Sequence, residues 1–399
     1  MGAHAAADDA VAEPKQSVLS ATLTDVELPH EQEDDWQHVP GIVWPVRVRQ
    51  PGRPPALVYL DLNHYINFAR TAAGDATVPA GYDELLGACR SARQDGRALF
   101  PLSATHYVEM SKILDPAQRK AVATIMQELS DFNVLLGRST IAALEIESML
   151  DVLLGHPTMG ESVPLLGSSA VWAFGLRGGL VLCDADGNDV ADQTGAAMRG
   201  DQLAQFLVDA NRFLERSLLA GPSDAEITDL RARGYAPERA HEVTARRAQQ
   251  ERDQALRLDA DRKYRRGRLR DVIGARELSM EWSDVLTRAV MARGITVGEA
   301  VSEDRDTIRA FAEGMPNSLV AITLKTRYHR DGNHRWTTND IHDIDALAVA
   351  VPYCDAVFTD KAAWSALTAS AELRPLNTFL PRRPGGLTDW INDQPIPAT

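Results

Sequence analysis

Four acidic residues stand close to the ends of short apolar segments of this sequence. They are Asp61, Glu109, Asp345 and Asp360. Carboxylate oxygens are the ligands that Mg²⁺ and Mn²⁺ prefer, and four carboxylates brought to one place would repel one another unless a cation lay between them. Such an ion can activate water and stabilise an in-line displacement at phosphorus. The pattern therefore predicts metal-dependent hydrolysis of a phosphodiester.

The third of these positions has competitors. Asp343 and Asp340 lie shortly before Asp345, and all three precede the small apolar segment 346–351. Asp343 is a real competitor for the third metal ligand, and Asp340 is a weaker one. An aspartate that follows a strand often only caps the next helix, which is the more common role for any one of these residues alone. The four positions taken together favour a metal site.

Short apolar runs must position these acids. The segments 56–62, 97–103 and 354–360 are predicted strands, a fourth strand is predicted at 373–376, and 83–94 has the length of a helix. Strands that alternate with helices predict a parallel sheet. Because the carboxyl ends of parallel strands share one edge, where ligands bind, the acids are expected to meet at that edge.

The middle of the chain has a different character. Apolar residues recur at helical spacing in 141–154 and 201–219, a hairpin is predicted at 178–187, and 225–279 is charged and rich in arginine. We expect one α/β domain interrupted by a mostly helical insertion. The predicted parts are a disordered acidic segment at 1–45, the first half of the domain at 46–130, the insertion at 131–310, and the second half at 311–399.

Composition excludes several classes of protein. The 399 residues carry 56 acidic and 42 basic side chains, a net charge of -14, so a global attraction to nucleic acid is excluded while a local basic patch is not. The three cysteines fit neither a disulfide framework nor a metal knuckle, which favours a reducing compartment. No segment approaches the length of a membrane span, and the N-terminus lacks the features of a signal peptide. A cytoplasmic protein without a membrane partner is therefore expected.

Four motifs together resemble the PIN-domain nucleases. Leu60-Asp61-Leu62-Asn63 is similar to the first motif of that family, and Ser103 to Glu109 resembles the second. Asp345 with the small residues after it resembles the third motif, and Phe358-Thr359-Asp360 the fourth. The matching segments, about 56–130 and 315–385, cover under half of the chain, and each motif is short. Their order and context carry the resemblance.

The resemblance implies a flavodoxin-like, three-layer α/β/α sandwich and an Mg²⁺- or Mn²⁺-dependent endoribonuclease that acts on single-stranded RNA. It also implies that Asp61, Glu109, Asp345 and Asp360 bind the metal, with Asn63, Ser103 and Thr359 supporting them. Arginines near the third motif are candidates for holding RNA phosphates, namely Arg327, Arg330 and Arg335. The insertion is a candidate for contacts with a protein partner.

Two other functions remain open at this point. One is a catalytically inactive PIN-like module that binds nucleic acid or protein. The other is a phosphatase-like hydrolase with Asp61 as nucleophile, a reaction that usually needs a second acid two positions later, where this chain has Asn63.

Overall fold

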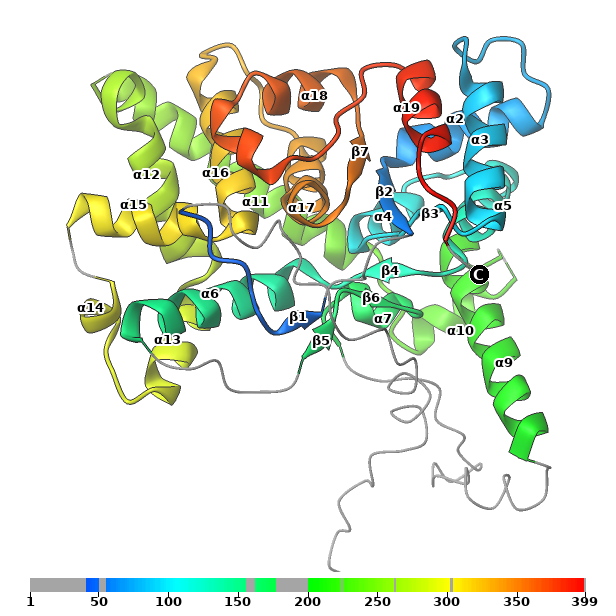
Figure 1. The fold of residues 1–399 in the computed structure, drawn as a ribbon, viewed down its shortest axis with the longest axis horizontal. Coiled ribbons are helices and arrows are strands. Elements are labelled where there is room, and N and C mark those ends of the chain that lie inside the picture. Colours follow the sequence, from blue (N-terminus) through cyan, green and yellow to red (C-terminus); the bar gives the residue numbers. More distant parts are fainter. Residues whose placement is uncertain are drawn as a thin grey trace, which may run out of the picture.

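A row of short parallel strands crosses the middle of the protein (Figure 1). This computed structural model describes residues 41–49, 55–155, 162–176, 200–223, 225–261, 263–301 and 304–397. Strand β2 (Ala56–Leu60) lies between β3 (Ala98–Leu99) and β7 (Ala356–Phe358), and both neighbours run parallel to it. The prediction that the strands near 57–60 and 356–359 belong to one sheet is confirmed.

Single bridges extend this row on both sides. Leu102, just after β3, bridges Val134 in β4 (Val134–Leu135), and Ala356 bridges Phe379. From one edge to the other, the row therefore consists of β4, β3, β2, β7 and the segment at Phe379. If the five segments are numbered by their order in the sequence, this is the order 3-2-1-4-5. The order turns back between β2 and β7, and in open parallel sheets ligands bind beyond the strand ends at such a point. This order differs from the flavodoxin-like order, in which the first strand lies between the second and third.

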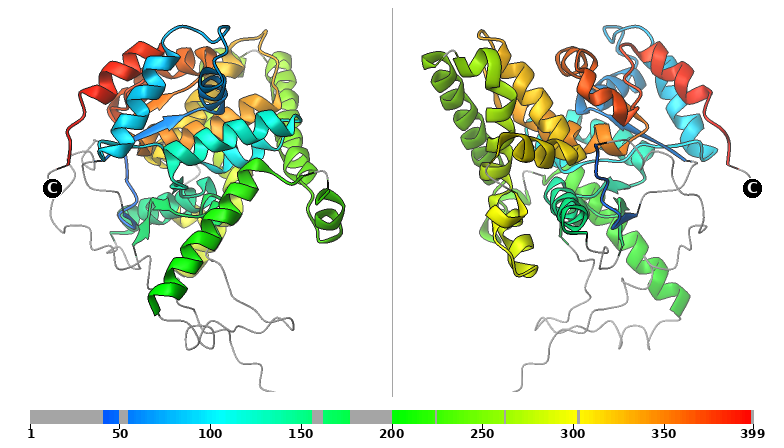
Figure 2. Two further views of the ribbon diagram at one scale, coloured as in Figure 1. Left: turned by 90° about the vertical axis from the view of Figure 1, so that its right-hand side faces the viewer. Right: turned by 60° about the vertical axis from the view of Figure 1, so that its left-hand side comes forward.

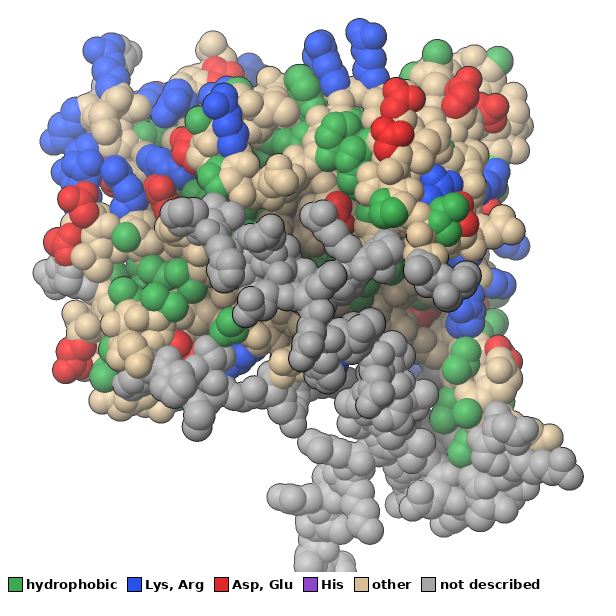
Figure 3. Space-filling model, viewed as in Figure 1, with side chains coloured by type: hydrophobic (Ala, Val, Ile, Leu, Met, Phe, Trp, Pro, Cys, Tyr) green, Lys and Arg blue, Asp and Glu red, His purple; other side chains and the backbone are tan. Residues whose placement is uncertain are grey.

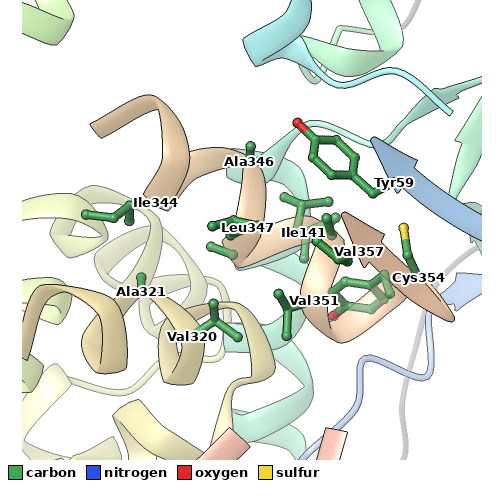
Figure 4. Packing of buried hydrophobic residues seen from close by; sticks show 14 of the residues in the cluster. Tyr59, Ile141, Val320, Ala321, Ile344, Ala346, Leu347, Val351, Cys354 and Val357 are labelled. Carbon is green, nitrogen blue, oxygen red and sulfur yellow. The ribbon is translucent and has the colours of Figure 1, made fainter. Parts of the chain in front are cut away.

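Side chains of β2 alternate between two buried cores. Leu57 and Tyr59 belong to one core, and Val58 and Leu60 belong to the other, as expected for a strand that is covered on both faces. The first core contains α16 (Pro316–Arg330), α17 (Thr338–Tyr353) and α18 (Lys361–Thr368). Figure 4 shows Tyr59 beside side chains of α17 in this core. The second core contains α2 (Leu62–Ala72), α3 (Tyr82–Gln94), α5 (Pro116–Ser130) and α19 (Pro384–Asn392).

The central part of the chain is mostly helical. Its elements are α6 (Arg138–Leu154), α9 (Gly200–Ala220), α10 (Ile227–Ala232), α11 (Glu238–Ala260), the π-helix η2 (Tyr264–Arg268), α12 (Leu269–Arg276), the π-helix η3 (Glu277–Glu281), α13 (Ser283–Ala292), α14 (Val297–Ala300) and α15 (Arg305–Gly314). Figure 2 shows α9 extending away from the other helices.

This helical part is continuous with the layers around the sheet. Its own core is shared, because α6 and α16 supply residues both to it and to the core around Leu57 and Tyr59. In addition, α11 packs on α17, and α12 packs on α16. The helices at 138–154 and 82–94 agree with the predicted ones. The exact limits of an insertion, 131 and 310, stay a prediction.

The remaining elements are short. They are β1 (Val48–Arg49), β5 (Val163–Pro164), β6 (Leu166–Gly167), α4 (Ala104–Met110), α7 (Ala170–Ala173) and the 3₁₀-helix η4 (Ala371–Leu376). The prediction of a strand at 373–376 is wrong, because Pro375 lies within η4 and the residue that bridges the row is Phe379. The predicted hairpin at 178–187, and residues 1–40 of the predicted disordered segment, lie outside the described residues.

The helices and the cysteines of the described residues bear on two expectations, the absence of a membrane span and the absence of disulfides. None of the described helices combines the length and the apolar character that a membrane crossing requires. Cys89 and Cys354 are buried free thiols, and Cys183 lies outside the described residues.

Candidate active site

Asp61 lies at the carboxyl end of β2, where the strand passes into α2. Its backbone N–H donates to the carbonyl oxygen of Phe358 at 3.0 Å, which fixes this turn against β7. Asp61 is the N-cap residue of α2, yet its side chain makes no capping hydrogen bond. Instead, the hydroxyl of Thr359 donates to its carboxylate. Helix capping therefore does not explain Asp61, whose carboxylate accepts from the backbone N–H of Leu62 and from the hydroxyl of Thr359.

Asp360 is delivered to the same edge by the neighbouring strand. Leu60 and Phe358 are register partners, so Asp61 and Asp360 follow paired strand ends. Asp360 does cap α18, since its Oδ1 accepts from the backbone N–H of Ala363 at 2.7 Å. The common capping role thus holds for Asp360, and its second carboxylate oxygen stays available for another partner.

Glu109 stands near the end of α4, and a buried histidine fixes that helix to β2. The backbone N–H of Ser103 donates to Nδ1 of His106 at 2.9 Å, so Nε2 carries the proton and donates to the carbonyl oxygen of Leu60 at 2.8 Å. Ser103 therefore starts α4 and holds His106 in place, and no contact between Ser103 and the acids is seen. Lys112 lies 3.7 Å from the carboxylate of Glu109.

Asp343 reaches this edge from α17. That helix begins with a reciprocal cap, in which Thr337 and Asp340 each accept from the backbone N–H of the other. Asp340 also lies 3.3 Å from Nε2 of His334. Its carboxylate is thus occupied at the helix start. Asp343 lies one turn further along and has no ion pair with any residue that the structure describes.

These four side chains, Asp61, Glu109, Asp343 and Asp360, form what we call the carboxylate cluster. Burial, followed by the charges of Asp61, Asp360 and Glu109, raises the pKa of Asp343 to about 9. Burial, followed by the charge of Glu109 and then that of Asp360, raises the pKa of Asp61 to about 7. Burial also raises the pKa of Glu109, and Lys112 opposes this shift. All four side chains keep partial exposure to solvent. The four acids therefore interact, and repulsion among them is only partly balanced.

The structure does not bring Asp345 into this cluster. Its carboxylate accepts from Arg138 at 2.6 Å and from Arg247 at 2.5 Å and 2.9 Å. Burial opposes ionisation, but Arg247 and Arg138 outweigh it and hold the pKa of Asp345 well below its usual range. Successive helical residues are about 100° apart around the axis, so residues 343 and 345 face directions roughly 200° apart. We therefore assign the third acidic position to Asp343, the competitor that the sequence left open, and withdraw it from Asp345.

Asp345 belongs instead to a buried group of paired charges, which we call the ion network. Its acids are Asp345, Glu251, Glu277 and Glu281, and its bases are Arg138, Arg247, Arg276 and Lys325. The charges are equal in number, and four of the side chains come from α11 or η3 in the central part. His329 adds a hydrogen bond to Glu251 at 2.8 Å, and burial lowers its pKa, which favours the neutral ring.

Asn63 and His64 lie next to Asp61 on the first turn of α2. The side-chain oxygen of Asn63 is buried and has no hydrogen-bond partner, which is unusual for a buried polar atom. His64 is buried, stacks on Phe358 with ring centroids 3.7 Å apart, and shares a 2.7 Å hydrogen bond with the hydroxyl of Tyr82. His64 is thus a packed residue, whereas the buried oxygen of Asn63 lacks a hydrogen-bond partner.

The predicted phosphate-binding arginines lie at the end of α16 and in the loop before α17. Arg330 and Arg335 are exposed, Arg327 is partly exposed, and none has an ion pair within the described ranges. Lys325 and His329, which are close to them in sequence, are buried in the ion network. The three arginines thus remain available to solvent while their neighbours do not.

Two residues near the cluster were missed by the sequence patterns. Burial, followed by Asp343, Asp340 and Asp360, raises the pKa of Tyr328, so a neutral phenol lies beside three acids. Lys112 is the basic residue that pairs with Glu109. A helical spacing signal was available for Lys112, which follows Glu109 by three residues, but no spacing signal marked Tyr328.

The chemistry of this donor set fits a hard divalent cation, although the side chains as placed are not a closed coordination group. Across the described part of the chain, no three His, Cys, Asp or Glu side chains are arranged so that they could hold a metal ion as they stand. The donors are all carboxylate oxygens, and the charges of neighbouring acids contribute to the raised pKa values of Asp61 and Asp343. Hard cations such as Mg²⁺ and Mn²⁺ select such ligands.

Comparison with known proteins gives no relative from which a role could be taken. The chain matches no protein-family model, no curated protein and no solved structure.

Proposed function

We propose that this protein is a metal-dependent phosphodiester hydrolase, and specifically an endoribonuclease that cleaves single-stranded RNA. We further propose that its sheet and helices form a PIN-like, three-layer α/β/α sandwich. The cores on the two faces of β2 support the layered arrangement. The four short motifs that resemble PIN-domain nucleases support the activity, with Asp343 in place of Asp345 in the third motif.

One observation carries the proposal. Four acids from four separate elements gather where the strand order turns back. Burial raises the pKa of Glu109, and burial together with neighbouring acids raises the pKa values of Asp61 and Asp343. Perturbed acids gathered at a ligand-binding edge are a mark of functional sites. Capping explains only Asp360, because Asp61 makes no capping bond and Glu109 and Asp343 lie beyond the first turn of their helices.

The residues of the cluster have distinct roles in this proposal. Asp61, Glu109, Asp343 and Asp360 would hold Mg²⁺ or Mn²⁺, and the bound ion would activate water and neutralise charge that develops at phosphorus. Thr359 orients the carboxylate of Asp61, and His106 holds α4, with Glu109, against the end of β2. Lys112 opposes the effect of burial on the pKa of Glu109 and so favours its ionised form, which binds a cation.

RNA must approach an acidic protein, so a local basic surface is needed beside the site. Arg330 and Arg335 are exposed at the segment that leads into α17, and Arg327 is partly exposed on the turn before them. Phosphate contacts of this kind position a strand without reading its sequence. We propose that these arginines hold the RNA backbone while the carboxylate cluster acts on one phosphodiester.

The proposal is tested by cleavage of a labelled single-stranded RNA with Mg²⁺ or Mn²⁺, with chelator as control. The wild-type protein should cleave only with metal, and Asp61→Asn should abolish cleavage while circular dichroism stays unchanged. Asp306→Asn is the matched control, because Asp306 is an exposed acid on α15. RNA binding without cleavage, unchanged by chelator, would identify a binding module instead. Cleavage that survives in Asp61→Asn would remove Asp61 from the site.

A further inference from the structure

A hollow lies between α12 and α15, and none of the residues that line it belongs to the carboxylate cluster. It has a volume of about 290 Å³. Small-molecule pockets begin at roughly 300 Å³, so the hollow has room for a small ligand of about the size of a mononucleotide. Figure 3 shows Lys and Arg side chains gathered on the side of the molecule where Figure 1 places α12 and α15. The hollow therefore lies within a basic part of an acidic protein.

Arginine dominates the charged lining of this hollow. The charged residues there are Arg268, Arg270, Arg305, Arg309, Asp271 and Glu313. Four positive charges face two negative ones in the lining, and Glu372 pairs with Arg270 at 3.3 Å from outside it, so an excess of one positive charge remains. An anionic ligand is thus favoured, and a guanidinium is the side chain best suited to bind phosphate through paired hydrogen bonds.

The two acids fix three of these arginines without using all of their hydrogen-bond donors. Asp271 on α12 binds Arg305 through Oδ2 at 2.9 Å and Nε of Arg309 through Oδ1 at 2.8 Å. Glu313 on α15 binds Nε of Arg270 at 2.6 Å. Each guanidinium has five N–H donors, so the pairs orient these groups and leave donors for a ligand.

Two donors in the lining lack partners. Nη2 of Arg270 is buried and has no hydrogen-bond partner. Arg268 is exposed and has no ion pair within the residues that the structure describes. A buried donor without a partner is destabilising, so this position would gain from an anion or a polar ligand.

The rest of the lining is apolar or aromatic. Val272, Ile308 and Ala312 contribute aliphatic surface, and Tyr264 contributes a ring. Tyr264 and Arg268 both come from η2, a single turn of π-helix. Such turns are rare and frequently occur at functional sites. A ligand that suits this lining has an anionic phosphate at one end and a flat, partly apolar body at the other.

We propose that the hollow between α12 and α15 binds a nucleotide of mononucleotide size. Its phosphate is held by Arg268 together with Arg305 and Arg309, and its base lies against Tyr264 and Ile308. Binding here is separate from RNA cleavage, because none of these residues belongs to the carboxylate cluster.

Calorimetric titration of the full-length protein with AMP tests this site. AMP should bind at least tenfold more tightly than inorganic phosphate or adenosine, because only AMP uses both parts of the lining. Arg268→Gln should weaken AMP binding about tenfold, which corresponds to about 1.4 kcal/mol. Arg266→Gln is the matched control, since Arg266 is exposed in the same π-helical turn and does not line the hollow. Ala275→Phe, which fills the hollow, should abolish binding.

Several outcomes would overturn the proposal. These are no AMP binding at millimolar concentration, equal binding of AMP and phosphate, or an equal effect of Arg266→Gln and Arg268→Gln. If Ala275→Phe does not fold, Arg268→Gln alone decides. Asp343→Asn should keep full AMP affinity, so failure of the nucleotide site and failure of the nuclease proposal give different results.

Discussion

Asp343 and Asp345 lie two residues apart on α17, yet the two sides of this helix have opposite electrostatic surroundings. On one side, Asp343 faces three further acids, and burial with their charges raises its pKa to about 9. On the other, Asp345 accepts hydrogen bonds from Arg138 and Arg247, which hold its pKa below the usual range. Removing one partner from a balanced buried pair is strongly destabilising, whereas uncompensated like charges persist where a ligand is expected to supply the missing charge.

The largest expected effect separates these two aspartates by activity. Asp343→Asn should lower metal-dependent RNA cleavage about a thousandfold, or roughly 4 kcal/mol in activation free energy, because the amide cannot neutralise a cation. Asp345→Asn should retain cleavage within about tenfold at a temperature where it remains folded. Single-turnover cleavage assays measure both. If the order of the two effects is reversed, Asp345 is the metal ligand and our assignment is wrong.

The second effect separates them by stability. Asp345→Asn leaves two largely buried guanidinium groups without their shared acid, although each keeps one further acid, so the free energy of unfolding should fall by about 3 kcal/mol. Asp343→Asn should cause no such loss and serves as the matched control on the same helix. Urea denaturation at pH 7 in chelator measures both variants. Equal loss in the two variants would mean that the charges around Asp345 are not better balanced than those around Asp343.

The third effect concerns pH. The pKa of Asp343 is raised far above the value of about 3.9 expected in the unfolded chain, so its ionisation disfavours the folded state. Without metal, the protonated carboxyl of Asp343 therefore stabilises the folded state relative to the ionised one. This contribution is fully present below pH 4 and is lost as the pH rises towards 9. Asp343→Asn should therefore be more stable than the wild type by about 1–2 kcal/mol at pH 8. The two proteins should be equally stable at pH 4. Urea denaturation at both pH values measures the difference, and a gain that does not depend on pH would contradict the proposed repulsion.

The smallest expected effect is the number of protons released when the metal binds. The raised pKa values of Asp61 and Asp343 leave protons on the cluster near pH 7, and a cation must displace them. Mn²⁺ binding at pH 7 should release about one proton, and its affinity should rise with pH. Calorimetry in buffers of different ionisation enthalpy measures this release. Asp345→Asn should release the same number, whereas binding without proton release would show that the acids are already ionised.

The sequence predicted much of the carboxylate cluster and little of the ion network. Asp61 and Asp360 could be found because each follows a short apolar run, and parallel strand ends share an edge. The choice between Asp343 and Asp345 depends on where α17 begins. Thr337 and Asp340 carried that signal, because a threonine followed by an acid three residues later is a helix start, which places both aspartates inside the helix.

The ion network could not be predicted in the same way. The partners of Asp345 lie 207 and 98 residues away in the sequence, and nothing in the local pattern of Arg138 or Arg247 indicates which acid each will meet. The strand predicted at 373–376 failed for a local reason. A strand was predicted for this short segment, but Pro375 has no amide hydrogen to donate to a neighbour, and the segment forms a 3₁₀-helix.

The pairing of β2 with β7 also determines when the site can exist during synthesis. The backbone N–H of Leu57 donates to Asp355 across a separation of 298 residues, in a chain of 399. Ribosomes add about 5–20 residues per second, so roughly 15–60 s pass between the synthesis of these two strands. During that time the nascent chain carries Asp61 and Glu109 without Asp343 or Asp360. The proposed nuclease site is therefore incomplete on the ribosome, next to the messenger that encodes it, until almost the whole chain has emerged.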